Sequence, residues 1–522
     1  MQKLLSCFRS RQWMIAMVVA IGLIAVLSHS AMAQEAAPST APAAAPAIDP
    51  RAGAAALTSP EGVAINIVWT LVAGFLVMFM QAGFALVETG LCRAKNAAHV
   101  MSMNFLVYAL GMTGFFICGY ALMCGGAGKA PATINTTPGN DSLNAPFVVH
   151  IADHDWTLFG TKGFFLSGNS YDASALTWFL FMMVFMDTTA TIPTGALAER
   201  WKMSSFFIFS LFIGGFLYPI YGGWLWGGGW LSQLGQTSLG VGALDYAGSS
   251  VVHMQGGVLA LVCAWLLGPR IGKYDEKGNP KPLLGHNIPM VILGTFILAF
   301  GWFGFNAGSS LAADGRIGVV AVNTMLASAS GALASCLYMW CIHSGKKPDP
   351  SMMCNGMLAG LVAITAPCAY VAPWGAFVIG LIAGVLVVWS VFFFEKIGID
   401  DPVGAISVHG VNGAFGLLCV GIFADGSYGP IGFLYGEHKF NQFGAQFIAM
   451  IACFLWNVIA GGLIFFLIGK VLGSNRVSPE MEIAGLDIPE MGAPGYPEYI
   501  TPVLTENVPA SEVAAAKAQL GL

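Results

Sequence analysis

The sequence has few charged residues, because Asp, Glu, Lys and Arg together make up only 9% of its 522 positions. A soluble domain carries about 25% charged residues. Hydrophobic residues account for 56% of the chain, so the composition excludes a soluble globular protein and predicts an all-α polytopic membrane protein embedded in a lipid bilayer. The net charge of -5 provides no basic surface, so we expect no nucleic-acid partner.

Paired cysteines and catalytic motifs are also missing. Most of the 11 cysteines lie in apolar runs and none forms a C-x-x-C pair, so we expect neither a disulfide framework nor a metal knuckle. No H-E-x-x-H motif, phosphate loop or nucleophile–base pair supports a membrane-embedded enzyme. We therefore expect no catalytic residue, no cofactor and no metal. The segment from His150 to Asp155 could bind a surface metal, but a solvated loop is the favoured interpretation.

One stretch of the sequence occurs twice, 156 residues apart. Residues 245–257 read DYAGSSVVHMQGG and residues 401–413 read DPVGAISVHGVNG, which share the frame D-x-x-G-x-x-x-V-H-x-x-x-G. Because Asp is a good N-cap and Pro402 suits a first helical position, we expect a helix to start at each Asp. His253 and His409 would then lie about 12 Å along their helices, near the bilayer midplane.

Two interpretations of the duplicated histidines are open. A single intramembrane histidine can bridge two helices by a hydrogen bond, and a short repeat can arise by chance among many small residues. Ionisable groups inside a membrane are nevertheless functional by default, and here two share one frame. A polar pair at the midplane between inverted repeats is typical of a transporter site. The functional interpretation is therefore favoured.

The ends of the chain differ from its centre. Residues 1–33 resemble a secretory signal, with a basic start, an apolar core and an Ala-Met-Ala cleavage site, although an uncleaved extra span is the alternative. Residues 34–60 form an Ala/Pro-rich periplasmic tether by composition. We assign residues 61–473 to one transporter domain and residues 474–522 to a cytoplasmic C-terminal tail.

Eleven apolar segments are each long enough to span the membrane. With the mature N-terminus outside, thirteen Lys and Arg residues fall on the inside and four outside, which predicts an N-out, C-in orientation in the inner (plasma) membrane. The duplicated stretch is then inverted, so spans 1–5 and 6–10 form two inverted five-helix halves and the eleventh is extra. The segments lie near 63–90, 98–123, 174–197, 203–226, 247–268, 287–308, 317–342, 354–372, 374–394, 404–424 and 443–470.

Aromatic and polar residues gather in three further stretches. Residues 221–230 hold Trp226 among glycines, and residues 301–309 end in Ser309 at the same level. A tryptophan there is usually a membrane anchor, but its face can also hold a small cation. Phe181 and Phe185 lie four residues apart on one helix face. We expect the nearby Asp187 to form a hydrogen bond with a neighbouring helix.

Six motifs together resemble the Amt branch of the Amt/Mep/Rh ammonium transporters. They are MQAGFALVETG, GALAER, WGGG, DYAGSSVVH, GWFGFNAGS and DDPVGAISVHGVNG. The likeness runs from about Asn66 to Pro494, nearly the whole mature chain. It leaves out the Ala/Pro-rich tether and the residues after Pro494, and it assigns no transport role to Asp187.

The resemblance implies a homotrimer with one pore in each subunit, carrying ammonium or methylammonium. PII-type signal proteins would bind the cytoplasmic face and block the pore. A sensor of ammonium that transports little is the alternative function. The resemblance also implies site roles: substrate binding by Phe185, Trp226 and Ser309, gating by Phe185 and Phe305, a pore lined by His253, His409 and Trp302, and support of the site by Asp245 and Phe181.

Overall fold

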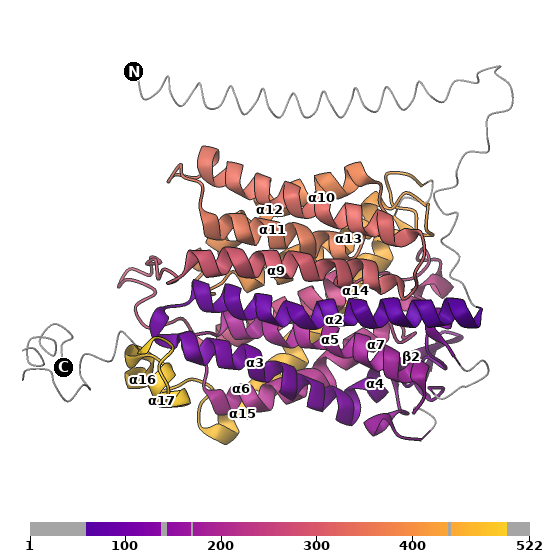
Figure 1. Cartoon of the computed structure of the whole chain (residues 1–522), viewed down its shortest axis with the longest axis horizontal. Helices are drawn as coiled ribbons and strands as arrows, with labels where there is room; N and C mark the ends of the chain where they lie inside the picture. Colours follow the sequence, from indigo (N-terminus) through magenta and orange to yellow (C-terminus); the bar gives the residue numbers. More distant parts are fainter. Residues whose placement is uncertain (1–58, 137–142, 169–170, 437–439, 498–522) are drawn as a thin grey trace, which may run out of the picture.

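Ten helices in the described part of the chain are long and apolar enough to cross a membrane. The structure is a computed structural model that describes residues 59–136, 143–168, 171–436 and 440–497. In Figure 1 the long helices run side by side, with α2 and α3 next to each other at the front. The predicted signal peptide and nearly all of the tether lie outside the described residues.

The eleven predicted spans all coincide with helices, and ten of these helices are long and apolar enough to cross a membrane. The eighth predicted segment, 354–372, is a helix of 16 residues, α11 (Pro350–Thr365), which is shorter than the roughly 20 residues that a transmembrane helix needs. Eleven crossings therefore remain a prediction. The ten long helices cover Pro60–Leu91, Ala94–Cys124, Ala173–Ala196, Met203–Leu225, Ser249–Leu267, Ile288–Ser310, Arg316–Ile342, Pro373–Lys396, Ile406–Phe423 and Asn441–Leu472.

Most of these long helices are composed of several shorter elements. Many of them contain a π-helical segment, and short 3-10 turns lie at the ends of others. The elements are α2 (Pro60–Leu91), η1 (Ala94–Asn96), α3 (Ala97–Gly114), η2 (Phe115–Gly119), α4 (Tyr120–Cys124), α5 (Ala173–Ala196), α6 (Met203–Phe212), η6 (Ile213–Leu217), α7 (Tyr218–Leu225), η8 (Ser249–Met254), α8 (Gln255–Leu267), α9 (Ile288–Asn306), η9 (Ala307–Ser310), α10 (Arg316–Leu337), η10 (Tyr338–Ile342), α12 (Pro373–Lys396), η11 (Ile406–Val411), α13 (Asn412–Phe423), α14 (Asn441–Trp456), η12 (Asn457–Gly461) and α15 (Gly462–Leu472).

Several helices start at a capping side chain followed by proline. Ser59 accepts a hydrogen bond from the Gly62 amide, and Asp349 accepts from Ser351 and Met352, each just before a proline in the first turn. Such a cap satisfies backbone donors that would otherwise lack a partner, and proline lacks the donor altogether. Local sequence therefore fixes where these helices begin, even though their composition is apolar throughout.

Burial separates a central layer of helices from an outer one. In α5 and in η8–α8, 89% and 83% of the most apolar window is buried inside the protein. In α14–η12–α15 the buried share is only 28%, although the sequence is more hydrophobic. A helix that exposes apolar residues is stable when lipid covers it. The central helices can therefore enclose a pathway, while the outer ones face the membrane.

The loop between α4 and α5 contains a small β-hairpin that the sequence analysis did not predict. Strands β1 (Pro146–Ile151) and β2 (His154–Gly160) pair in antiparallel fashion. The turn places the exposed His150 beside Asp155, with 3.0 Å between His150 Nδ1 and Asp155 Oδ1. Only residues 149–151 and 156–158 alternate between apolar and polar side chains, so the sequence carries a weak strand signal here.

A cluster of buried charges lies at the end of the bundle that we call the Arg270 end. Arg270 donates to both oxygens of Asp400, at 2.8 and 3.0 Å, and to Glu199 at 2.8 Å. Burial raises the pKa of Asp400, but Arg200 and Arg270 outweigh it and hold that pKa well below its usual range. The cluster joins loops from both halves of the chain, and removing one partner would leave an uncompensated buried charge.

The first part of the C-terminal tail packs on this same end. Two short helices, α16 (Pro479–Ala484) and α17 (Asp487–Met491), lie beside the start of α3 at the left of Figure 1. Asp487 accepts from the His99 amide at 2.9 Å, and Glu482 accepts from the Ile271 amide at 2.7 Å. The tail up to residue 497 is thus a docked part of the domain, while residues 498–522 lie outside the described residues.

Candidate pore and its two cavities

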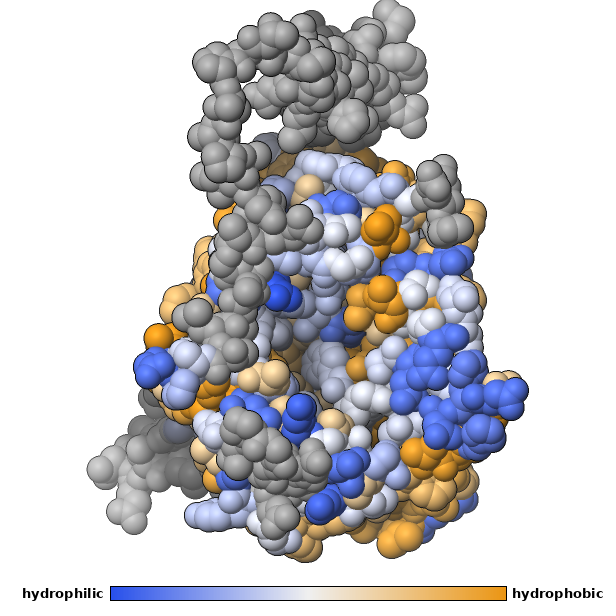
Figure 2. Space-filling model, turned by 90° about the vertical axis from the view of Figure 1, so that its right-hand side faces the viewer, coloured by the Kyte–Doolittle hydropathy of each residue, from blue (hydrophilic) through white to orange (hydrophobic). Residues whose placement is uncertain are grey.

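The opposite end of the bundle, which we call the Trp226 end, carries a cavity of about 260 Å³. Phe185, Trp226 and Ser309 all line it, as does Phe181. Figure 2 looks onto this end, where hydrophilic residues surround a hollow in the middle of the face and hydrophobic residues lie along its margins. Three residues from distant parts of the sequence therefore meet in one site, as the sequence analysis expected.

The side chains of this cavity present an aromatic face and a hydroxyl acceptor. The indole of Trp226 is fixed by a bond from Nε1 to the Asp245 carbonyl, 2.6 Å long, and its ring centroid lies 5.9 Å from that of Phe185. Ser309 donates its hydroxyl hydrogen to the Phe305 carbonyl at 2.8 Å, so its lone pairs remain available as acceptors. An aromatic face beside oxygen acceptors suits a small cation.

Two stacked phenylalanines close the bottom of the cavity. Phe185 and Phe305 have ring centroids 4.1 Å apart at an interplanar angle of 25°, and neither is exposed. Phe181 packs against Phe185 with centroids 4.7 Å apart, which confirms that these two residues share a helix face. Because both stacked rings are fully buried, a solute must displace them to move deeper.

The two histidines meet directly below this stack. His253 lies 5.3 Å from Phe305 and 5.2 Å from His409 between ring centroids, and the two Nδ1 atoms are 3.2 Å apart. Trp302 stacks on His253 at 5.1 Å and is held by a bond from its Nε1 to Thr365. The histidines bridge two helices, as the structural interpretation allowed, and His253 also packs against Phe305 of the stacked pair.

The two copies of the repeat run in opposite directions. Asp245 is tied to Trp226 at one end of the bundle, whereas Asp401 follows directly on Asp400, which binds Arg270 at the other end. Each copy therefore starts at its own end and reaches its histidine in the interior. The predicted inversion of this stretch is what brings the two rings together.

The helices of the repeat start later than the sequence analysis expected. The helical backbone begins at Ser249 after Asp245, and at Ala405 after Asp401, so Pro402 is not in the first helical turn. A glycine with positive φ precedes each helix, Gly248 at 114° and Gly404 at 83°. The carboxylates still cap their helices, but by reaching over a loop to several amides.

Asp245 shows how complete this capping is. Its two oxygens accept hydrogen bonds from the amides of Gly248, Ser249, Ser250 and Val251 and from the Ser250 hydroxyl, all between 2.7 and 2.9 Å. Burial raises the pKa of Asp245, and these donors act against that shift. Asp245 is connected to the cavity lining through Trp226, so its position fits a supporting residue.

A close crossing of the two repeat helices sets the separation of the histidines. A Cβ atom added at Gly257 would lie 2.1 Å from the Gly410 amide nitrogen. Each histidine also lies in a π-helical segment, η8 or η11, rather than in a regular α-helix. Such π segments often mark functional sites, and here η2, η6, η10 and η12 are π-helical as well. The sequence signals the crossing only by its glycines, and it gives no signal for the π geometry.

Asp187 departs from its expected role. It is buried in α5, and its Oδ1 has no hydrogen-bond partner in the described part of the chain. The expected bond to a neighbouring helix is therefore not formed by that oxygen. Asp187 lines neither the cavity of the Trp226 end nor a smaller cavity beside His409. The sequence analysis also missed Glu88, a second buried carboxyl group, which the same search for intramembrane charges could have found.

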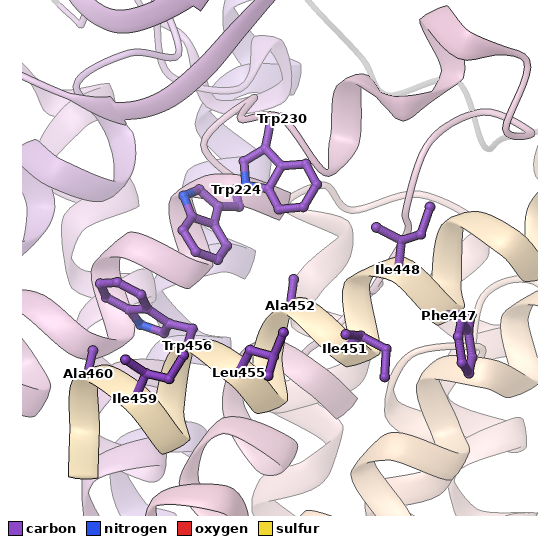
Figure 3. A pocket seen from close by; sticks show the side chains of 10 residues that line it. All are labelled: Trp224, Trp230, Phe447, Ile448, Ile451, Ala452, Leu455, Trp456, Ile459 and Ala460. Atoms are coloured by element: carbon purple, nitrogen blue, oxygen red, sulfur yellow. The ribbon is translucent and has the colours of Figure 1, made fainter. Parts of the chain in front are cut away.

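An apolar groove of about 600 Å³ is separate from this pathway. Figure 3 shows Trp224 and Trp230 on one side of it and residues of α14 and η12, including Trp456, on the other. The indole nitrogens of Trp224 and Trp456 are already bonded to backbone carbonyls, so the groove offers mainly apolar surface. Such a surface on the outer helices suits contact with lipid, not recognition of a cation.

Comparison with known proteins identifies the family. The model described as "Ammonium Transporter Family" matches residues 68–496. The chain belongs to this family. Ammonium transporter Amt2 of Archaeoglobus fulgidus is 47% identical over 465 residues, which cover 87% of this chain and 92% of the relative. Ammonium transporter Amt1 of Haloferax mediterranei is 39% identical over 456 residues, covering 84% and 80%. These relatives place the chain in the Amt branch, a group of transporters and not of enzymes.

Solved structures agree with this assignment. A structure titled "Sensor Amt Protein" has a TM-score of 0.70 and 36% identity, covering 82% of this chain and 98% of that one. Candida albicans Mep2 has a TM-score of 0.66 and 27% identity, covering 80% and 86%. The chain is thus a multi-pass membrane protein of the Amt/Mep fold, and its family indicates ammonium transport.

Proposed function

We propose that this protein transports ammonium and methylammonium by binding the cation outside, removing a proton at the gate and passing neutral ammonia through the pore. The observation that carries this proposal is the unbroken series of rings from Trp226 through Phe185 and Phe305 to His253 and His409. Trp226 lines an open cavity, and the two histidines at the other end of the series can exchange a proton. The rings are therefore arranged in the order binding, gating and proton transfer.

Each part of the series has a physical role in the proposal. Trp226, Phe185 and Ser309 bind ammonium, with the cation–π contribution worth roughly 1–2 kcal/mol. Phe185 and Phe305 gate the pore, with Phe181 behind them, and Asp245 holds Trp226. Bringing an ammonium-sized ion into a low-dielectric interior costs of the order of 20 kcal/mol in the idealised limit. Ammonia escapes most of that cost, so deprotonation at the gate makes passage along Trp302 and the histidines feasible.

The proposed assembly follows the family resemblance and the charge distribution. We assign a homotrimer with one pore per subunit, an N-out and C-in orientation across eleven spans, and the inner (plasma) membrane as the location. The Trp226 end then faces outward and the Arg270 end faces the cytoplasm. A PII-type signal protein is the proposed cytoplasmic partner, and the docked tail helices lie at the face that it would approach. Cleavage of residues 1–33 remains a prediction.

A sensor role is the second candidate function. It is favoured by one finding, the likeness to the structure titled "Sensor Amt Protein" over 98% of that chain. A sensor would keep the outer cavity and bind ammonium there, but it would move little substrate across the membrane. The two functions therefore differ in the rate of uptake and not in recognition.

Uptake of labelled methylammonium into proteoliposomes that contain the purified protein tests both functions. We expect accumulation well above that of empty liposomes, and inhibition of it by unlabelled ammonium. Binding of ammonium without uptake would replace the transport proposal by the sensor role. Absence of both binding and uptake by a folded protein would contradict each of them.

A further inference from the structure

Glu88 is a buried carboxyl group in α2 that the proposed pathway does not yet use. Its side chain is only 3% exposed. The Asn104 amide and the Thr194 hydroxyl both donate to Glu88 Oε2, each at 2.7 Å, and no Lys or Arg forms an ion pair with it in the described part of the chain. A buried carboxyl group without a counter-charge is costly inside a membrane, so its presence calls for a function.

Glu88 lies on the face of α2 that is directed toward the histidine pair. Phe84, one helical turn earlier, has its ring centroid 5.9 Å from that of His409. Residues four apart share a helix face, so Glu88 lies about one turn, roughly 6 Å, beyond Phe84 along the helix axis. Helix α2 is followed by Arg93, which contacts the charge cluster of the Arg270 end. Glu88 therefore lies farther from the gate than Phe84 does, and nearer to the Arg270 end.

A small cavity connects Glu88 with His409. It has a volume of about 20 Å³, and its polar lining comes from Glu88, Asn355 and His409. A volume of about 10–15 Å³ accommodates one water molecule, which needs two to four polar partners. The cavity therefore has the size and the polar groups for a single water. Its other lining residues are apolar, including Ala405 and Leu358.

His409 and Glu88 each have a hydrogen-bonding atom left to bind a water in this cavity. His409 shares its Nδ1 with His253, so Nε2 is the ring nitrogen left for the cavity side. A carboxylate has about four acceptor sites, and the bonds from Asn104 and Thr194 leave capacity for a water. Another acid nearby, Asp401, is engaged with the amides of Val403, Gly404 and Ile406.

Resting on the transport function proposed above, we propose that Glu88 is the proton acceptor on the inner side of the histidine pair. The Nε2–H bond of protonated His409 breaks and its proton passes to the cavity water. That water gives one of its own protons to the Glu88 carboxylate, so the water is unchanged. The resulting carboxylic acid then protonates an ammonia molecule that leaves toward the Arg270 end, which restores both ammonium and the carboxylate.

Replacement of the carboxyl group by an amide tests this assignment. Glu88→Gln keeps an oxygen for the bonds from Asn104 and Thr194 but cannot take up the proton. We expect methylammonium uptake into proteoliposomes to fall at least tenfold, with the half-saturation concentration unchanged. Glu61→Gln, the same change at the exposed start of the same helix, is the matched control and should keep wild-type uptake.

Two further variants separate proton transfer from a merely structural role. Glu88→Asp restores a carboxyl group, so we expect it to recover part of the uptake with a changed pH profile. Ala405→Val keeps Glu88 but fills the space of the water, and we again expect at least a tenfold loss. The Ala405 variant also tests the proposal if Glu88→Gln does not assemble.

The outcomes distinguish this inference from the function on which it rests. Absence of uptake by the wild-type protein would refute transport itself. Wild-type uptake that stays within twofold in folded Glu88→Gln would refute only the role of Glu88. If that variant does not fold, unchanged uptake in Ala405→Val would refute the path through the cavity.

Discussion

At the scale of single residues, different side chains of the proposed pathway should provide cation recognition and cation selectivity. Potassium and ammonium have similar size and the same charge, so an aromatic cavity distinguishes them poorly. Only ammonium can lose a proton and continue as a neutral molecule. Trp226 and Ser309 should therefore determine apparent affinity, whereas His253 and His409 should determine which cations are rejected.

Substitutions in the outer cavity should weaken binding by a small and measurable amount. Trp226→Leu removes the cation–π face and Ser309→Ala removes an acceptor. Each substitution should weaken the binding free energy of ammonium by roughly 1–2 kcal/mol, and every 1.4 kcal/mol raises the half-saturation concentration about tenfold. The measurement is concentration-dependent methylammonium uptake. Trp265→Leu is the control, because Trp265 is 67% exposed on the outside of α8. Unchanged half-saturation in both cavity variants would contradict the assignment.

A fixed charge in place of a histidine should destroy selectivity. His253→Asp introduces a carboxylate where two imidazoles, which ordinarily titrate near pH 6.5, meet below the gate. We expect this variant to admit water and potassium. The measurement is growth of a potassium-uptake-deficient host on limiting potassium, with the wild-type protein as control. A folded, trimeric variant that does not rescue growth would show that the histidines are not the barrier.

At the scale of helices, the sequence predicted the elements better than the details of their starts. The repeated frame and its inversion followed from Asp245, Asp401 and the distribution of Lys and Arg. The sequence could not reveal that each Asp caps its helix across a glycine loop, because that needs the positive φ values of Gly248 and Gly404. The β-hairpin was also missed, because its two strands are short and only residues 149–151 and 156–158 alternate between apolar and polar side chains.

The crossing of the repeat helices should tolerate no side chain. Gly257→Ala would place a Cβ atom 2.1 Å from the Gly410 nitrogen, so the helices must separate and the two histidines with them. We expect a loss of uptake of tenfold or more and a lower melting temperature in detergent. Gly318→Ala is the control, since a Cβ there meets nothing within 4 Å. The control should be neutral or slightly stabilising, because alanine favours helix over glycine. Wild-type uptake in Gly257→Ala would show that the crossing distance does not matter.

At the scale of the whole molecule, the candidate site was predicted more fully than the packing around it. The residues proposed for the outer cavity, the gate and the pore came from motifs, and the structure brings their rings into one connected set of contacts. The charge cluster of Arg270, Asp400 and Glu199 was not predicted, because its members lie in three separate loops. Glu88 was overlooked because its apolar neighbours made it part of a span rather than a site.

The charge cluster should stabilise the fold in a pH-dependent way. Asp400→Asn leaves the buried Arg270 with one partner fewer, so we expect a destabilisation of about 3–5 kcal/mol at neutral pH. The folded pKa of Asp400 is depressed, so its contribution is fully present above the unfolded value of about 3.9 and is lost as the pH falls toward the folded value. The measurement is thermal unfolding of the wild-type protein and of Asp400→Asn in detergent, at a series of pH values from neutral to acidic.

The shape of that pH dependence provides the check on the charge cluster. Wild-type stability should fall on acidification below about pH 4, and the loss should be smaller in Asp400→Asn, which has no proton to take up at this position. Equal stability of the two proteins at neutral pH would show that the charge of Asp400 contributes nothing net. That result would leave the transport proposal untouched, because the cluster lies outside the pore.

The central claim is that this protein passes ammonium by removing its proton and rejects potassium by the cost of dehydrating it. The most direct test measures uptake of labelled methylammonium and labelled potassium by the same wild-type proteoliposomes. We predict methylammonium uptake that survives excess potassium, together with potassium entry no faster than into empty liposomes. Potassium entry at a rate comparable to that of methylammonium would contradict the account.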